Sequence, residues 1–225
     1  MQTQAISITI DHLGLAGDLR IPENASGLVV FAHGSGSNRR SPRNRYVAQA
    51  LEQGGLATLQ FDLLTPDEAR IDEMTRELRF DPVLLGDRLG AATDWMRHER
   101  RFEPLPIGYF GASTGAAAAI RAATGRPGVV RAVVSRGGRP DLAGAALRTI
   151  ETPTLLIVGG ADTEVIELNA RAFRGMRGVK EKEMVIIPGA THLFPEAGAM
   201  EEVTRLTRDW FTRHLATVPV SGAIW

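Results

Sequence analysis

One serine of this chain stands in a setting that suits a nucleophile. It is Ser113, the centre of the pentapeptide Gly-Ala-Ser-Thr-Gly at 111–115, which follows a short apolar run and precedes an alanine-rich stretch. A G-x-S-x-G sequence between a strand and a helix turns the chain sharply, strains the serine backbone and projects the hydroxyl above the sheet. The helix N-terminus beside it favours developing negative charge. We therefore expect Ser113 to be a nucleophile; the alternative is a Ser/Thr N-cap of the helix.

Five histidines are available as a general base for this serine. His192 lies in the loop 188–194, Pro-Gly-Ala-Thr-His-Leu-Phe, directly after the last strand-like apolar run. Such a loop at the carboxyl edge of a sheet reaches a site at the same edge, so we assign His192 as the base, with a polar loop residue as the alternative. The other histidines lie in a turn (His12), late in charged helices where we expect them to be solvated (His98 and His214), or in a separate motif (His33).

The third member of a triad is a carboxylate that orients the histidine and stabilises its imidazolium. Asp162 follows the apolar run 154–158 and a Gly-Gly turn, and we assign it this role. The structural alternative for Asp162 is an N-cap of the following helix, and the two roles are compatible. Two other aspartates that follow strands, Asp141 and Asp62, are rival candidates.

A second polar loop offers the backbone donors that acyl transfer needs. Residues 33–37, His-Gly-Ser-Gly-Ser, end an early apolar run. The tetrahedral intermediate carries an oxyanion that preorganised N–H groups bind, and we expect these to be the N–H groups of Thr114 and Ser35. The alternative is a phosphate-binding loop, but position 39 is arginine where G-x-G-x-x-G has its last glycine, and no G-K-[ST] occurs here. We expect His33 to be a structural hydrogen-bonding residue under the loop.

Alternating strands and helices are needed to position these loops. Residues 4–10 alternate apolar and polar and 15–21 resemble a returning strand, which predicts an antiparallel hairpin. Beyond it, apolar runs typical of strands covered on both faces alternate with helical patterns, which predicts a parallel α/β sheet. The expected strands are 28–32, 57–61, 107–110, 129–134, 154–158 and 184–187, and the expected helices are 42–53, 82–99, 114–124, 164–174 and 198–215. For 62–81 we expect a solvated connection, with a short helix near the site as the alternative.

The composition excludes several other kinds of protein. The 225 residues include no cysteine, which excludes thiol nucleophiles, disulfides and Cys-ligated metal sites. Lys+Arg and Asp+Glu both number 26, so no net charge attracts nucleic acid or an anionic membrane. No apolar run reaches the length of a membrane span, about 18 residues, and the N-terminus lacks the features of a secretory signal. We expect a cytoplasmic protein that acts on a small molecule.

Four loops occur in an order that resembles a known family. They are His33-Gly-Ser-Gly-Ser, Gly111-Ala-Ser-Thr-Gly, Gly159-Gly-Ala-Asp and Gly189-Ala-Thr-His, within 4–215. The order Ser113, Asp162, His192, with intervals of 49 and 30 residues, is that of α/β-hydrolases. Together the loops resemble a small α/β-hydrolase of the dienelactone hydrolase-like group. The resemblance implies an eight-stranded, mostly parallel sheet whose first strands are antiparallel, and no cofactor.

The chain departs from this group at its nucleophile. Dienelactone hydrolases proper use a cysteine, whereas this chain has Ser113, which favours ordinary serine esterase chemistry over action on lactone-dienes. The interval from 134 to 154 is too short for the large cap that many α/β-hydrolases insert, so we expect an open pocket. We expect a single domain over 1–216 and a C-terminal tail over 217–225; whether the protein forms a homodimer stays open.

These inferences converge on the hydrolysis of carboxylic esters with small acyl chains. The same triad serves a thioesterase, a lactonase or an acyltransferase, and a non-catalytic binding module with this fold is a further alternative. Six arginines lie close in sequence to the expected site: Arg39, Arg40, Arg43, Arg45, Arg136 and Arg139. These arginines have two interpretations. They form surface ion pairs and helix caps, or they bind a carboxylate or phosphate on the substrate.

Overall fold

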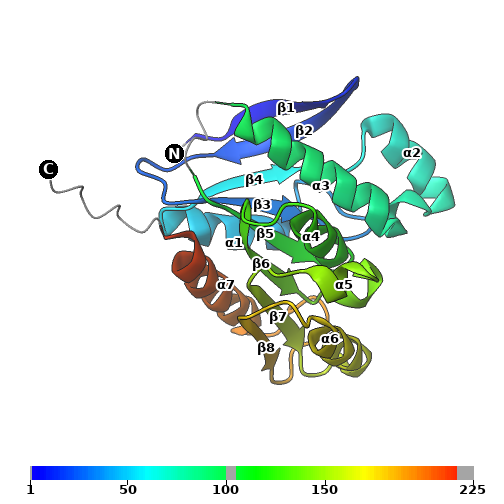
Figure 1. Ribbon diagram of the computed structural model, residues 1–225, viewed down its shortest axis with the longest axis vertical. Helices are drawn as coiled ribbons and strands as arrows, with labels where there is room; N and C mark the ends of the chain where they lie inside the picture. The colour runs from blue at the N-terminus through cyan, green and yellow to red at the C-terminus, as the bar shows by residue number, and fades with distance from the viewer. Residues whose placement is uncertain (1, 100–104, 217–225) are drawn as a thin grey trace, which may run out of the picture.

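Eight strands form one mixed sheet through the centre of the molecule (Figure 1). The computed structural model describes residues 2–99 and 105–216. The strands are β1 Gln4–Ile10, β2 Leu13–Arg20, β3 Leu28–Ala32, β4 Ala57–Phe61, β5 Ile107–Ala112, β6 Val130–Arg136, β7 Thr154–Gly159 and β8 Lys182–Ile187. Their order in the sheet is β1-β2-β4-β3-β5-β6-β7-β8. All neighbours from β4 to β8 are parallel, so their carboxyl ends form one edge.

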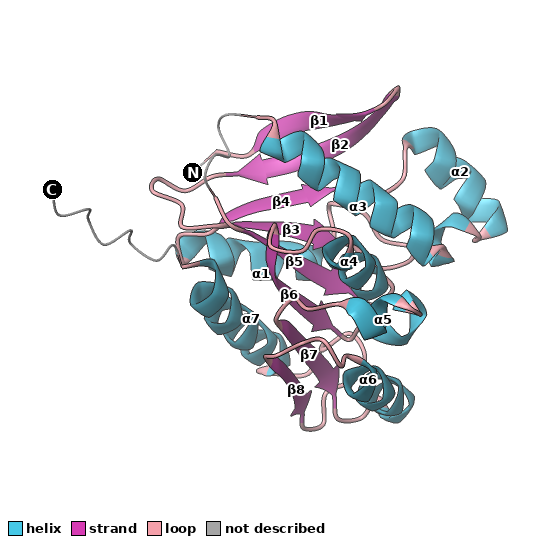
Figure 2. Cartoon of the chain, viewed as in Figure 1, coloured by secondary structure: helices cyan, strands magenta, loops and turns pink. Residues whose placement is uncertain are grey.

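Helices cover both faces of this sheet (Figure 2). They are α1 Pro42–Gln53, α2 Pro66–Thr75, α3 Pro82–Arg97, α4 Gly115–Thr124, α5 Ala146–Thr149, α6 Thr163–Gly175 and α7 Ala199–Leu215, with 3-10 turns η1 Leu78–Phe80 and η3 Pro140–Ala143. Apolar side chains of α1 and α7 pack in a cluster on one face. Those of α3 and α4 pack in a second cluster on the other face. The result is a three-layer α/β molecule, as the alternating sequence pattern predicts.

The first two strands form the predicted hairpin. Strands β1 and β2 are antiparallel, and β2 is also antiparallel to β4. Alternate residues of β2 are buried, Leu15 and Leu19 among them, because only one face of this edge is covered. Strands β3, β4, β5 and β7 are buried at every residue, as expected for central parallel strands. The rigid centre thus carries the loops after β3, β5 and β7.

The expected strands and helices are confirmed, and where an end differs from the expected one it does so by one or two residues. The hairpin strand 15–21 is Leu13–Arg20, and the expected strand 129–134 extends to Arg136. That extension places Arg136 within the sheet, where it pairs with Ala112 and Ile157. Between β6 and β7 the chain holds η3 and α5, in agreement with the expectation that no large cap is inserted there.

The stretch 62–81 corrects one expectation. It holds α2 and η1 and not merely a solvated connection, so the alternative of a short helix near the site is the correct one. The helix begins with a capping box, in which Thr65 and Glu68 bond each other's backbone N–H groups. Glu68 also pairs with Arg88 of α3 at 2.7 Å. Glu68 therefore attaches α2 to α3.

The expected tail at 217–225 lies outside the described residues. Within 2–99 and 105–216, no helix combines the length and apolar character that crossing a bilayer requires.

Candidate active site

Ser113 lies on the sharp turn between β5 and α4, in a conformation that L-residues rarely adopt. Its φ is +51°, which costs about 1–3 kcal/mol for a non-glycine residue and is concentrated at functional sites. The turn is held on both sides, since the N–H of Ser113 donates to Arg136 O at 3.2 Å and its carbonyl accepts the N–H of Arg139 at 3.0 Å. Helix α4 has no side-chain N-cap, which removes the capping interpretation, and Ser113 is partly exposed.

Two glycines provide the space that this turn requires. A Cβ at Gly111 would lie 2.5 Å from Ala116 Cα, and a Cβ at Gly115 would overlap the carbonyl oxygen of Ala32 on β3. A side chain at either position would push α4 away from the sheet. The two glycines of G-x-S-x-G therefore follow from the close packing of β3, β5 and α4 around the serine.

His192 and Asp162 meet at the ends of β8 and β7. The Nδ1 of His192 and the Oδ2 of Asp162 are 2.7 Å apart. Asp162 stands at the N-cap position of α6 without a side-chain capping bond, so its carboxylate serves the histidine and not the helix. In this arrangement the Nδ1–H donates to the carboxylate and Nε2 remains to accept a proton. The His192 side chain is 38% exposed and that of Asp162 is 17% exposed, so the imidazole is open to substrate.

The turn after β6 contacts both the serine and the histidine. Its first and last residues, Arg136 and Arg139, bond the Ser113 backbone. Between them, a Cβ on Gly137 would lie 2.9 Å from His192 O and 3.7 Å from His192 Cε1. Ser113 and His192 thus flank one tight turn. Their side chains form no hydrogen bond to each other in the described part of the chain, a common state before substrate binds.

The rival acids have other partners. Asp141 accepts two hydrogen bonds from the Arg139 guanidinium, at 2.9 and 2.8 Å. Asp62 accepts the backbone N–H of Arg39 at 2.8 Å and also pairs with its guanidinium. Neither aspartate is bonded to His192, so Asp162 is the acid that the geometry favours.

The remaining histidines lie away from the serine. His12 and His98 are exposed, as expected. His214 is not solvated, contrary to the prediction: its side chain is 11% exposed and its ring lies 4.5 Å from that of Trp210. The reason is that α7 packs against the sheet along this face, which a count of charged neighbours in the sequence does not reveal.

His33 holds the loop after β3 in place through two hydrogen bonds of its ring. Its Nε2 accepts the N–H of Leu63 at 3.1 Å, and its Nδ1 lies 3.0 Å from Gly34 O, so Nδ1 carries the proton and donates. Burial lowers the pKa of His33, against smaller opposing effects of the Gly34 carbonyl and Asp62, and the ring stays neutral. The prediction of a structural hydrogen-bonding role for His33 is confirmed.

Both expected oxyanion donors belong to backbone that adjoins Ser113. A Cβ on Gly34 would lie 3.1 Å from Ser113 Cβ, so the backbone next to Ser35 passes close to the nucleophile. Thr114 follows Ser113 at the start of α4 and is buried. The assignment of the N–H groups of Ser35 and Thr114 to an oxyanion hole stays a prediction.

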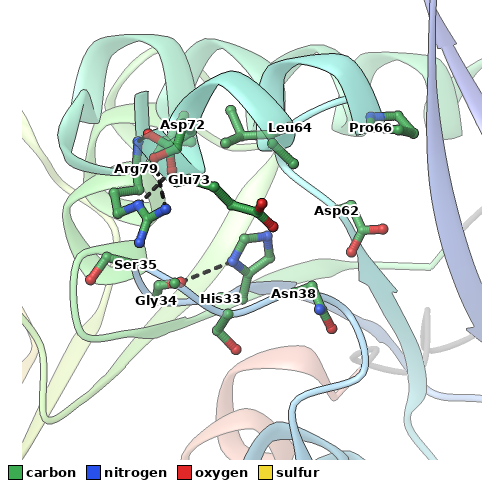
Figure 3. Close-up of a pocket in the computed structure, with 14 residues that line it drawn as sticks. His33, Gly34, Ser35, Asn38, Asp62, Leu64, Pro66, Asp72, Glu73 and Arg79 are labelled. Atoms are coloured by element: carbon green, nitrogen blue, oxygen red, sulfur yellow. Dashed lines mark hydrogen bonds and ion pairs between the residues drawn. The ribbon is translucent and has the colours of Figure 1, made fainter. Parts of the chain in front are cut away.

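A cavity of 420 Å³ opens beside this loop (Figure 3). His33, Gly34 and Ser35 form one wall, and α2 with the residues before it forms the opposite wall. The nucleophile and His192 lie outside its lining, across Gly34. The sequence does not reveal that α2 forms this wall, because the position of the helix depends on tertiary contacts. The lining residues on the α2 side are Leu64, Pro66, Ala69, Asp72, Glu73 and Arg79.

The charges in this cavity are mostly paired. Arg79 donates to Asp72 from its Nε at 2.5 Å and from its backbone N–H at 3.0 Å. Burial alone would raise the pKa of Asp72, but the hydrogen bonds from Arg79 outweigh it and hold that pKa below its usual value. Glu73 extends from α2 toward His33 (Figure 3). The cavity therefore holds apolar surface, hydroxyl groups and carboxylates, without a free cation among its described lining residues.

Comparison with known proteins agrees with the fold. The profile of the dienelactone hydrolase family matches residues 15–216. A dienelactone hydrolase from Anabaena variabilis, known from its crystal structure, is 54% identical and superposes with a TM-score of 0.92, over 95% of this chain and 98% of that one. Est1E from Butyrivibrio proteoclasticus, in a structure with bound ferulic acid, is 17% identical with a TM-score of 0.79, over 95% of this chain and all of that one. The latter likeness shows a shared fold alone.

A curated relative from Mycobacterium tuberculosis H37Rv carries the name putative phosphoribosyl transferase. It is 50% identical over 222 residues, which are 99% of this chain and 49% of the relative. The chain thus spans about half the length of the curated relatives it matches. The family profile nevertheless covers most of the chain. The chain belongs to the dienelactone hydrolase family.

Proposed function

We propose that this protein is a serine hydrolase that cleaves carboxylic esters of small acyl chains. The observation that carries the proposal is the 2.7 Å bond between His192 and Asp162, at the same sheet edge as a serine held at a φ of +51°. A strained serine, a histidine and a carboxylate that orients it are the parts of an acyl-transfer triad. Membership in a hydrolase family supports this reading.

In the proposed reaction, Ser113 Oγ attacks the acyl carbon while its proton passes to Nε2 of His192. The N–H groups of Ser35 and Thr114 bind the resulting oxyanion. Collapse of the tetrahedral intermediate breaks the ester bond, and His192 returns the proton to the leaving alcohol. Water then attacks the acyl-enzyme with His192 as base, which releases the acid and restores Ser113. Asp162 stabilises the imidazolium in both halves.

We propose small-molecule esters as substrates because the cavity beside the oxyanion loop is limited to 420 Å³. This volume suits a compact acyl or alcohol group. The balanced charge of the chain favours a cytoplasmic enzyme without a nucleic-acid or membrane partner. The fold and family leave thioesters and lactones as related substrates of the same acyl-enzyme.

The name of the curated relatives suggests a different reaction, phosphoribosyl transfer. Those relatives are about twice as long as this chain. We propose that ester hydrolysis belongs to the stretch that the relatives share with this chain, because in this chain that stretch contains the His192–Asp162 pair. We assign no phosphoribosyl transfer to it.

The proposal is tested by replacing the nucleophile. Ser113→Ala should abolish hydrolysis of p-nitrophenyl acetate and leave the circular dichroism spectrum unchanged, because it removes only the attacking oxygen. Ser7→Ala, at an exposed position of the edge strand β1, is the control for loss of a hydroxyl. Undiminished turnover by folded Ser113→Ala would refute the assignment.

A further inference from the structure

Arg136 is a buried cation without an acidic partner. Its side chain lies at the carboxyl end of β6, and the residue is 5% exposed. Its Nη2 donates to Asn44 Oδ1 at 3.4 Å, and its Nε has no hydrogen-bond partner. Among the described residues, no carboxylate forms an ion pair with it. The Phe194 ring lies 6.0 Å from its guanidinium carbon.

Two other arginines near the site form ion pairs with aspartates. Arg39 pairs with Asp62, and Arg139 pairs with Asp141. Arg136 differs, because no opposite charge compensates its burial. Burial, and to a smaller extent the nearby charge of Arg43, lowers the pKa of Arg136 to about 10. A guanidinium with that pKa is still charged at neutral pH. Buried charges are normally paired, since an unpaired one is costly, so this cation calls for an anion from outside the chain.

The start of α1 adds to the same positive region. Asn44, which receives the Arg136 bond, lies in the first turn of this twelve-residue helix, and that turn contains no acidic residue. Pro42 has no N–H and the N–H of Asn44 is capped by Ser41, which leaves the N–H of Arg43 for a ligand. The exposed Arg43 side chain adds a second cation. Helix N-termini with basic side chains bind phosphate and similar anions.

This region adjoins the proposed triad. The carbonyl of Arg136 accepts the Ser113 N–H, and Phe194 follows His192 by two residues. Arg43 and Phe194 line a cavity of 290 Å³ on this side. Two carboxylates also line it. Glu196 accepts the Thr191 hydroxyl at 2.6 Å with its Oε1, whereas its Oε2 has no partner among the described residues, and Glu201 is bonded by Tyr46.

From these contacts we infer that Arg136, Arg43 and the first turn of α1 form a subsite for a phosphate group carried by the ester substrate. A phosphate dianion has two charges and more acceptor oxygens than a carboxylate, so two guanidinium groups can neutralise it together, whereas one of them suffices for a carboxylate. Arg136 supplies the buried fork of donors, and Arg43 supplies an outer cation and a backbone N–H. This inference rests on the proposed function for its link to the ester, but the anion site itself is independent of catalysis.

Inorganic phosphate is the direct probe of the subsite. The melting temperature of the protein is measured in inorganic phosphate, in acetate and in sodium chloride at equal ionic strength. We expect phosphate to raise Tm the most, because a ligand that binds only the folded state stabilises it. Arg136→Met should lose this shift and the exposed variant Arg43→Met should reduce it. Arg45→Met, on the same helix but 3.5 Å from Asp18, should keep it.

Three outcomes would overturn the inference. They are a phosphate shift no larger than that in chloride, an equal shift in acetate, and a full phosphate shift in a folded Arg136→Met or Arg43→Met protein. None of these measurements depends on turnover, so their failure is distinct from failure of the esterase proposal.

A kinetic comparison then tests the link to the substrate. The wild type should have a higher kcat/KM for an acetyl ester of glycerol phosphate than for acetylglycerol. Arg43→Met should lower that ratio by roughly tenfold, the usual effect of one charge-assisted hydrogen bond. An unchanged ratio in Arg43→Met, with both esters hydrolysed, would separate the phosphate site from the substrate and contradict the inference.

Discussion

Asp162 has two possible tasks at the start of α6, and its side chain performs only one of them. Its carboxylate lies 2.7 Å from His192 Nδ1 and makes no capping bond to the helix. A carboxylate in this position holds the imidazole in the tautomer that presents a free Nε2 to the serine. In the proposed mechanism, this bond links Asp162 to the rate of acyl transfer.

Asparagine at this position should damage catalysis without damaging the fold. In Asp162→Asn the amide can donate to Nδ1 and favour the wrong tautomer, so we expect kcat for p-nitrophenyl acetate to fall by roughly 10³–10⁴-fold. Glu164→Gln, which removes an exposed carboxylate from the first turn of the same helix, should keep the wild-type kcat. A folded Asp162→Asn enzyme with wild-type kcat would remove Asp162 from the triad.

His33 should make the stability of the protein depend on pH. The folded state keeps its buried ring neutral with a lowered pKa, whereas the unfolded chain protonates it near pH 6.5. Below that pH the unfolded state binds more protons, so the free energy of unfolding falls as the pH drops. The loss levels off once the pH passes the lower pKa of the folded state.

His33→Gln isolates this contribution, since glutamine offers a donor and an acceptor but does not titrate. Urea denaturation between about pH 5 and pH 7 should give a shallower slope for His33→Gln than for the wild type. The difference should approach about 1.4 kcal/mol per pH unit over part of this range. Parallel curves for the two proteins would show that His33 is not held neutral in the folded state.

At the scale of secondary-structure elements, the junction of β3, β5 and α4 is the most closely packed part of the site. The glycine that begins α4, Gly115, has no space for a Cβ beside the backbone of Ala32 and His33, whereas Gly125 at the other end has only Ala122 O at 3.8 Å. Neither glycine has a positive φ. The φ of Gly125, the C-cap of α4, is −76°. The two positions form a matched pair for testing steric demand.

We expect Gly115→Ala to lower the free energy of unfolding by about 1–3 kcal/mol or more, because the new methyl group meets backbone that cannot move easily. Gly125→Ala should change it by less than about 1 kcal/mol, in the stabilising direction, since alanine restricts the unfolded chain. Urea denaturation measures both. Equal stability of Gly115→Ala and Gly125→Ala would show that the elbow is looser than its contacts indicate.

Helix α2 illustrates what the sequence could not predict at this scale. Its capping box at Thr65 and Glu68 is a local signal, but its position over the cavity depends on pairs with distant residues, such as Glu68 with Arg88. The sequence shows charges at these positions without showing their partners. The fold predicted from the apolar runs is correct, whereas the wall opposite the oxyanion loop could be identified only from tertiary structure.

For the whole molecule, the sheet order explains why so much of the candidate site is visible in the sequence. The parallel strands β3, β5, β7 and β8 end at one edge, so the polar loops that follow them converge wherever they lie in the chain. The site at Ser113, Asp162 and His192 could thus be predicted from loop order. The sequence identifies Arg136 only as one of six arginines near the site. Its burial could not be predicted, because it follows from two extra residues of β6 and from the contact with Asn44 of α1.

The assignment of Ser113 as the nucleophile is tested by the intact mass of the protein after treatment with a fluorophosphonate probe. We expect one covalent adduct, located on Ser113 by peptide mapping, because only an activated serine attacks such a probe. The adduct should be absent in Ser113→Ala and form far more slowly in His192→Gln. A folded wild-type protein that forms no adduct, or an adduct that persists at another residue in Ser113→Ala, would contradict the assignment of Ser113 as the nucleophile.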